Sequence, residues 1–225
     1  MLLDISKIGK ILKEQNRLLS VEFNTQIPLK IEVKKEINPI TYLIKLGNKE
    51  IETKSFIPLK VGNKYLANVI EKKGKITIQN LKPYPKLLEL LEKLPLIKET
   101  EFTKEKILEH LSNAKTKEEF LFYANILFAF QKGIRHIFIN EKNNKAIMQF
   151  KYEKNLITFY AAFKFLGELK GKITPNKVTI YTQFENVKNL LLDNSDKIEK
   201  KVEVFLEKKI TPIFEFKNSL IDIKA

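Results

Sequence analysis

The sequence predicts an α+β protein with a small five-stranded β-barrel domain, a helical linker and a C-terminal antiparallel sheet with two helices. Three observations predict this class: short alternating apolar runs between residues 27 and 81, an interruption at 82–85 that contains two prolines, and helical followed by alternating patterns from residue 86 onward. The predicted divisions are an amphipathic N-terminal helix at 1–20, the barrel at 21–82, a helical connector at 83–131 and an α+β domain at 132–225.

The N-terminal part combines one helical pattern with several strand patterns. Residues 2–19 place apolar side chains at helical spacing with lysines between them, which predicts an amphipathic helix. Five short alternating runs follow, separated by turn formers such as Asn38-Pro39, Gly62-Asn63 and Lys73-Gly74. Five short strands close their edges most economically as a barrel of the oligonucleotide-binding or SH3-like kind.

The connector begins where the strand pattern stops. Pro83 and Pro85 lack the backbone N–H that a sheet ladder needs, so the boundary is placed there. Helices are expected from Lys86 to just before Pro95 and from 103 to 111. A third helix is expected from Thr116, because Glu119 stands at the capping-box spacing, and it ends at Gly133. Its sequence is apolar nearly all round, which predicts a central position.

The last part alternates again. Apolar residues at every second position from Ile157 to Phe165 are expected to share one face of a sheet. From residue 185 to 209 the spacing becomes helical, and residues 210–225 are predicted to form one or two final strands. This order of elements predicts an α+β domain with an antiparallel sheet.

The chain carries a formal net charge of +14, and Arg17 and Arg135 are its only arginines. Scarce guanidinium groups argue against sequence-specific DNA recognition. The lysine excess fits a solvated surface as well as a surface for polyanions or acidic partners. On a basic barrel, Tyr42, Phe56 and Tyr65 can stack bases while lysines hold the backbone, although aromatics at strand spacing more often fill a core.

Several chemistries have no candidate residues. The chain has no cysteine, and none of its glycines form a phosphate-binding loop. His110 and His136 lack a second histidine at metal-ligand spacing, so a structural role is expected for both. The carboxylate pairs lie among lysines, where nothing raises a carboxyl pKa toward neutrality. No cofactor, metal or catalytic site is predicted, and the protein is expected not to be an enzyme.

Two further patterns bear on location. The longest uncharged apolar run, 120–130, is shorter than the roughly 20 residues of a membrane-spanning helix. Asp4 and Lys7 interrupt any apolar core of a secretory signal. The chain is therefore expected in the cytoplasm, without a membrane span.

Residues 165–202 resemble the C-terminal domain of the flagellar hook-length control family, in which a Leu-Gly pair precedes two strands, a leucine-rich helix, a second helix and closing strands. Leu166-Gly167 matches the Leu-Gly pair of the family. Residues 42–81 resemble a small β module that some members of the family carry. The matching positions are Leu169 and Ile173 for the first strand, Val178, Ile180 and Thr182 for the second, Leu190 to Leu192 for the first helix, and Ile198, Val202 and Phe205 for the second helix. Two features depart from the family: Phe163-Lys164-Phe165 replaces a proline and an acidic residue, and no long proline- and glutamine-rich segment is present.

The resemblance implies a non-enzymatic protein that docks to a flagellar export-gate protein and switches which substrates are exported, and that can itself pass through the type III apparatus. Docking is expected through an apolar strand surface together with the last residues of the chain. The residues assigned to this surface are Phe165, Leu166, Gly167, Leu169, Ile221 and Ile223. The alternative function is a lysine-rich protein that binds single-stranded nucleic acid through its N-terminal barrel.

Overall fold

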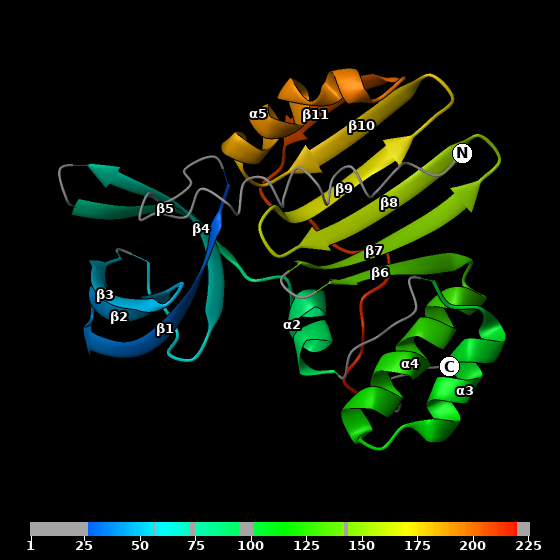
Figure 1. Ribbon diagram of the computed structural model, residues 1–225, viewed down its shortest axis with the longest axis horizontal. Coiled ribbons are helices and arrows are strands. Elements are labelled where there is room, and N and C mark those ends of the chain that lie inside the picture. The colour runs from blue at the N-terminus through cyan, green and yellow to red at the C-terminus, as the bar shows by residue number, and fades with distance from the viewer. Residues whose placement is uncertain (1–26, 56, 73–74, 95–100, 142–143, 220–225) are drawn as a thin grey trace.

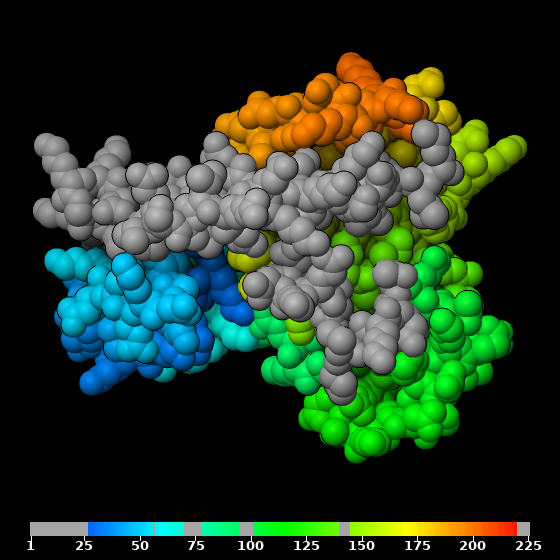
Figure 2. All heavy atoms as spheres, in the orientation of Figure 1, coloured from blue at the N-terminus to red at the C-terminus, as the bar shows by residue number. Residues whose placement is uncertain are grey.

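The computed structural model describes residues 27–55, 57–72, 75–94, 101–141 and 144–219. It contains two β-sheets, and a short helix follows the last strand of the first sheet (Figure 1). In the space-filling view the residues of the two sheets occupy opposite ends of the long axis (Figure 2).

The first sheet is antiparallel and has the order β3-β2-β1-β4-β5. The strands are β1 (Leu29–Asn38), β2 (Thr41–Leu46), β3 (Lys49–Lys54), β4 (Lys64–Lys72) and β5 (Lys75–Pro83). The five strands confirm the alternating pattern, but the predicted closed barrel is wrong: β3 and β5 are the two edges, and no ladder joins them in the part of the chain that the structure describes. Alternation specifies which residues face a core, whereas closure depends on strand tilt and register, which alternation does not encode.

Three helices follow: α2 (Lys86–Lys93), α3 (Lys104–Asn113) and α4 (Lys117–Gln131). The predicted capping box at the start of α4 is confirmed, because Thr116 accepts from the Glu119 backbone and the Glu119 carboxylate accepts from the Thr116 backbone. The helix packs against α3 and the edge strand β6 (Ile134–Glu141) of the second sheet. Six of its residues are buried: Phe122, Tyr123, Ala124, Asn125, Ile126 and Ala129.

The second sheet has six strands in the order β11-β10-β9-β8-β7-β6. They are β6 (Ile134–Glu141), β7 (Asn144–Glu153), β8 (Leu156–Phe163), β9 (Gly167–Ile173), β10 (Lys177–Thr182) and β11 (Lys201–Leu206). Strands β6 to β10 are antiparallel as expected, but β10 and β11 are parallel and are connected through α5 (Glu185–Asp193) and the 3₁₀ turn η2 (Ser195–Lys197). The prediction of a wholly antiparallel sheet is therefore wrong for its last pair.

The second helix predicted around Ile198, Val202 and Phe205 is also wrong. Val202 and Val204 lie on β11 and pair with Val178 and Ile180 of β10. β-branched residues suit this pleated environment better than a helix. A partner strand more than twenty residues away in sequence therefore overrides the local helical spacing.

The chain after β11 forms no strand up to residue 219, which corrects the prediction for that part of 210–225. Instead it runs behind the second sheet in the view of Figure 1, from β11 toward α2 and α4. Within the described ranges, no helix is long and apolar enough to cross a membrane.

Candidate functional site

Residues 207–219, here called the strap, lie across one face of the second sheet. A row of directly opposed residues crosses this face from β11 to β6, and opposed residues share a face. The row consists of Phe205, Tyr181, Lys170, Tyr160, Gln149 and His136. Most of these side chains carry polar groups, so the sheet presents the strap with hydrogen-bonding partners as well as apolar surface.

The strap is tied to the sheet at its start. The Glu207 backbone N–H donates to the carbonyl of Thr182 at 2.8 Å, and the Glu207 carboxylate pairs with Lys170 at 2.7 Å. The Gln183 side chain donates to the carbonyl of Lys208 at 3.2 Å. Ile210 is buried, which places the strap firmly on the sheet within a few residues of β11.

Gln149 binds the main chain of the strap through both atoms of its amide. Its Oε1 accepts from the Phe214 N–H at 3.0 Å, and its Nε2 donates to the Phe214 carbonyl at 2.9 Å. The Gln149 side chain is fully buried on β7. It therefore replaces, for one residue of the strap, the pair of hydrogen bonds that a neighbouring strand would supply.

Asn125 repeats this arrangement three residues further along the strap. Its Oδ1 accepts from the Lys217 N–H at 2.8 Å, and its Nδ2 donates to the Lys217 carbonyl at 3.0 Å. The same Nδ2 donates to the carbonyl of Leu121 at 2.7 Å within α4, which orients the amide. We call Gln149 and Asn125 the two amide clamps.

His136 supports the first clamp. The second N–H of the Gln149 amide points to His136 Nε2 at 3.1 Å, so that nitrogen is the acceptor and the proton sits on Nδ1. Burial lowers the pKa of His136 to about 3, which keeps the ring neutral. Its Nδ1 has no hydrogen-bond partner in the described part of the chain. The structural role expected for His136 is thus positioning of Gln149.

Aromatic contacts hold the strap between the clamps. The Phe216 ring packs at 5.5 Å from both Phe122 of α4 and His136 of β6, measured between ring centroids. The Phe214 ring lies 6.1 Å from Phe216 and has Lys132 Nζ at 5.5 Å from its centroid. The intervening Glu215 is exposed. The strap is therefore recognised by its main chain and by two aromatic side chains two positions apart.

A pocket of about 240 Å³ continues from the end of the strap between α2 and α4. Its apolar wall includes Leu90, Leu94, Leu121 and Phe122, and the strap contributes Phe216, Lys217 and Asn218 to its lining. We call the amide clamps, the aromatic contacts and this pocket together the strap site.

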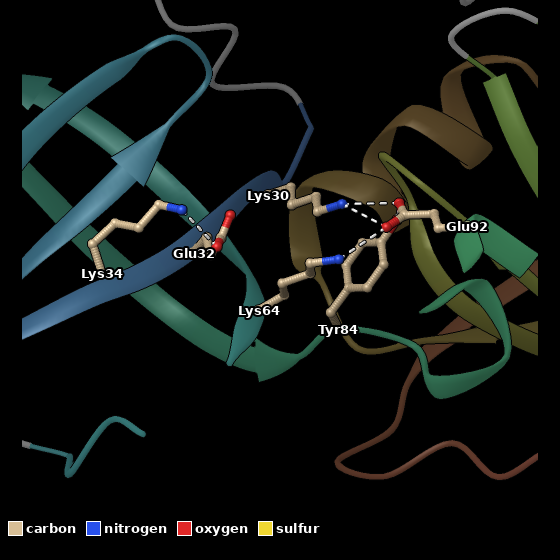
Figure 3. Close-up of polar contacts among 6 residues, drawn as sticks. All are labelled: Lys30, Glu32, Lys34, Lys64, Tyr84 and Glu92. Carbon is tan, nitrogen blue, oxygen red and sulfur yellow. Dashed lines mark hydrogen bonds and ion pairs between the residues drawn. The ribbon is translucent and has the colours of Figure 1, made fainter. Parts of the chain in front are cut away.

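A second polar cluster joins the first sheet to α2 (Figure 3). Glu92 of α2 receives Lys30 Nζ at 2.8 Å, Lys64 Nζ at 3.1 Å and the Tyr84 hydroxyl at 2.8 Å. Burial raises the pKa of Glu92, but hydrogen bonds from Lys30 and Tyr84 and the charge of Lys30 outweigh it and lower the pKa to about 2. Burial and the Glu92 carboxylate raise the pKa of Tyr84. Glu92 therefore stays ionised at neutral pH, and the cluster joins β1 and β4 to α2.

The residues predicted to dock a partner are mostly enclosed. Leu166 and Leu169 are 4% and 5% exposed and belong to the larger core, and Phe165 is half-buried after the end of β8. Gly167 has a φ of +75°, and a Cβ there would stand 3.0 Å from the Phe184 ring. Ile221 and Ile223 lie outside the described residues. Packing explains the apolar character of Leu166 and Leu169, and their role in docking stays a prediction.

The aromatics considered for base stacking are placed differently from one another. Tyr42 is buried, and its hydroxyl donates to the Pro39 carbonyl and accepts from the Leu59 N–H. Tyr65 is half-buried and accepts from the Lys60 N–H. Phe56 lies outside the described residues. Tyr42 and Tyr65 thus form part of the packing of the first sheet.

The strap site was missed from the sequence, although it left a signal there. Asn125 is the single amide within the apolar run 120–130, and Gln149 interrupts an apolar strand. Buried amides require hydrogen-bond partners, so their presence in such runs indicates a polar contact that the run itself cannot supply. Among the described residues, no group of three or more histidine, aspartate or glutamate side chains could hold a metal ion.

Comparisons of the chain with protein-family models, with curated proteins and with solved structures gave no match. The strap site is therefore characterised by its own geometry.

Proposed function

We propose that the protein is a non-enzymatic interaction protein whose strap site binds an extended segment of a partner protein in place of its own strap. The observation that carries this proposal is the pair of amide clamps. Gln149 and Asn125 each bind both the N–H and the carbonyl of one strap residue. Such contacts are open to the main chain of any extended segment, as in recognition by strand addition.

The strap is suited to exchange because side chains, and not a ladder, hold most of it. Among the described residues, the strap shares a backbone hydrogen bond with the sheet at Glu207, where the strap begins. Opening the strap beyond Lys209 therefore leaves the ladders of the second sheet intact. A partner segment that enters the strap site restores the main-chain hydrogen bonds of both buried amides, which would otherwise keep only their contacts with His136 and with the Leu121 carbonyl.

The resemblance to the flagellar hook-length control family gives the proposed partner, an export-gate protein, and a place of action in the cytoplasm. In support, β9, β10 and α5 follow Leu166-Gly167 in the family's order, and α5 carries Leu190 to Leu192. Against a close correspondence, β11 stands where the family has a second helix. In this proposal, docking of the partner segment and release of the strap constitute the switch.

The test uses the full chain and a fluorescent peptide with the sequence of residues 209–219. A tethered strap competes at an effective concentration in the millimolar range, so the peptide should bind the unchanged chain weakly. Substituting Phe214→Ser and Phe216→Ser in the chain weakens its own strap, and fluorescence anisotropy should then show at least a tenfold gain in affinity for the peptide.

Two variants control this experiment. Adding Gln149→Ala to the strap-substituted chain should abolish binding, because the first clamp is lost. Adding Gln79→Ala, which changes an exposed glutamine on β5, should leave binding unchanged. Failure of the peptide to bind the folded strap-substituted chain would contradict the proposal. Capture of an export-gate protein by the full chain, with competition by the peptide, separately tests the partner.

A further inference from the structure

The end of the strap fills its site incompletely. The pocket of about 240 Å³ beside Asn218 has leucine and phenylalanine side chains on its wall, Lys93, Lys117 and Glu118 also line it, and Asn218 itself is exposed. An apolar cavity of about 150 Å³ is large enough for benzene. The pocket can therefore receive a whole large apolar side chain, which an asparagine amide does not replace.

The positions along the strap show which residue would enter this pocket. Phe214 and Phe216 are half-buried, whereas Glu215, Lys217 and Asn218 are exposed. Asn218 nevertheless lines the pocket, together with Phe216 and Lys217. A segment in the same register thus has the side chain of the residue two positions after its second aromatic beside the pocket.

We infer that the partner segment has an aromatic residue, any residue, a second aromatic residue, any residue and then a large apolar residue. The first two aromatics take the positions of Phe214 and Phe216, and the apolar residue fills the pocket between α2 and α4. This inference rests on the proposed function. Its consequence is that the chain's own strap is the weaker occupant and yields to a partner that completes the pattern.

The experiment compares three labelled peptides on the folded, strap-substituted full chain. They are the sequence of residues 209–219, the same peptide with Asn218→Leu, and the Asn218→Leu peptide with Phe214→Ser and Phe216→Ser. Burial of the leucine predicts about tenfold tighter binding of the second peptide than of the first. Loss of both aromatics predicts at least tenfold weaker binding of the third than of the second.

A pocket variant identifies where the leucine acts. Leu90→Phe on α2 enlarges a wall residue, so it should remove the advantage of the Asn218→Leu peptide while the unmodified peptide binds as before. The inference would be overturned if the folded chain bound all three peptides equally, or if the Asn218→Leu peptide bound no tighter than the unmodified peptide. Either result would leave the proposed function standing. Absence of binding by every peptide would instead overturn the proposed function, and the inference with it.

Discussion

Replacing Glu92 by glutamine tests the electrostatic connection between the first sheet and α2. The carboxylate is held by Lys30, Lys64 and Tyr84, and its pKa falls from the ordinary value of 4.5 to about 2 (Figure 3). A shift of this size corresponds to about 3 kcal/mol without screening. Because the Glu92 side chain is 19% exposed and both lysines are 25% exposed, solvent reduces the expected contribution to about 1–2 kcal/mol.

The pH dependence has a definite sign. The unfolded carboxyl group takes up a proton near pH 4.5, whereas the folded one resists protonation down to about pH 2. Acid therefore favours the unfolded state, and the contribution of Glu92 is complete above about pH 5 and is lost as the pH falls toward 2. Urea denaturation followed by circular dichroism should show Glu92→Gln less stable by about 1–2 kcal/mol at pH 7, with the two proteins converging in acid.

Glu89→Gln is the matched control, because it removes one carboxylate from the same helix and Glu89 belongs to none of the ion pairs of the cluster. It should leave the pH profile close to that of the unchanged chain. A constant difference between Glu92→Gln and the unchanged chain from pH 7 to pH 3 would refute this account of the cluster.

Three further changes test other parts of the structure. Leu169→Glu places a charge in the larger core and should abolish the cooperative thermal transition, whereas a nearly unchanged melting temperature would show that Leu169 faces solvent. Gly171→Ala should lower the free energy of unfolding in urea by about 3 kcal/mol or more, because the new Cβ would stand 2.2 Å from the Thr179 carbonyl oxygen. Gly167→Ala should lower it by less, about 1–2 kcal/mol. The reverse order of the two losses would contradict the packing. The alternative function is binding of single-stranded nucleic acid by surface lysines. It predicts that the logarithm of the binding constant falls with the logarithm of the salt concentration, with a slope of about −0.7 per phosphate neutralised. Absence of binding near 50 mM salt would exclude this function.

The sequence identified most strands and the three connector helices because each depends on the periodicity of neighbouring residues. Thr116 and Glu119 marked the start of α4 because a capping box is a contact across three residues. The barrel and the helix at 198–205 were wrong for the opposite reason. Sheet closure, and the parallel pairing of Val202 with Val178, depend on strands far apart in the chain.

The strap site depends almost wholly on such distant contacts. Gln149 meets Phe214 across 65 positions, and Asn125 meets Lys217 across 92. Each amide was visible as a polar residue in an apolar run, but its partner is a backbone group, and backbone groups leave no mark in the sequence. The contacts of Phe216 with α4 and β6 likewise follow from the path of the strap.

We expect the strap, which is bound through its main chain, to open independently of the sheet beneath it. Native-state hydrogen exchange of the full chain, resolved by residue, measures both properties for the N–H groups of Phe214 and Lys217. Both amides should be protected, and they should exchange with an opening free energy clearly below that of the β8 amides. If the two amides exchange only when β8 opens, the strap is an inseparable part of the second sheet. If they exchange at the unprotected rate, the amide clamps do not form. Either result would contradict the proposal.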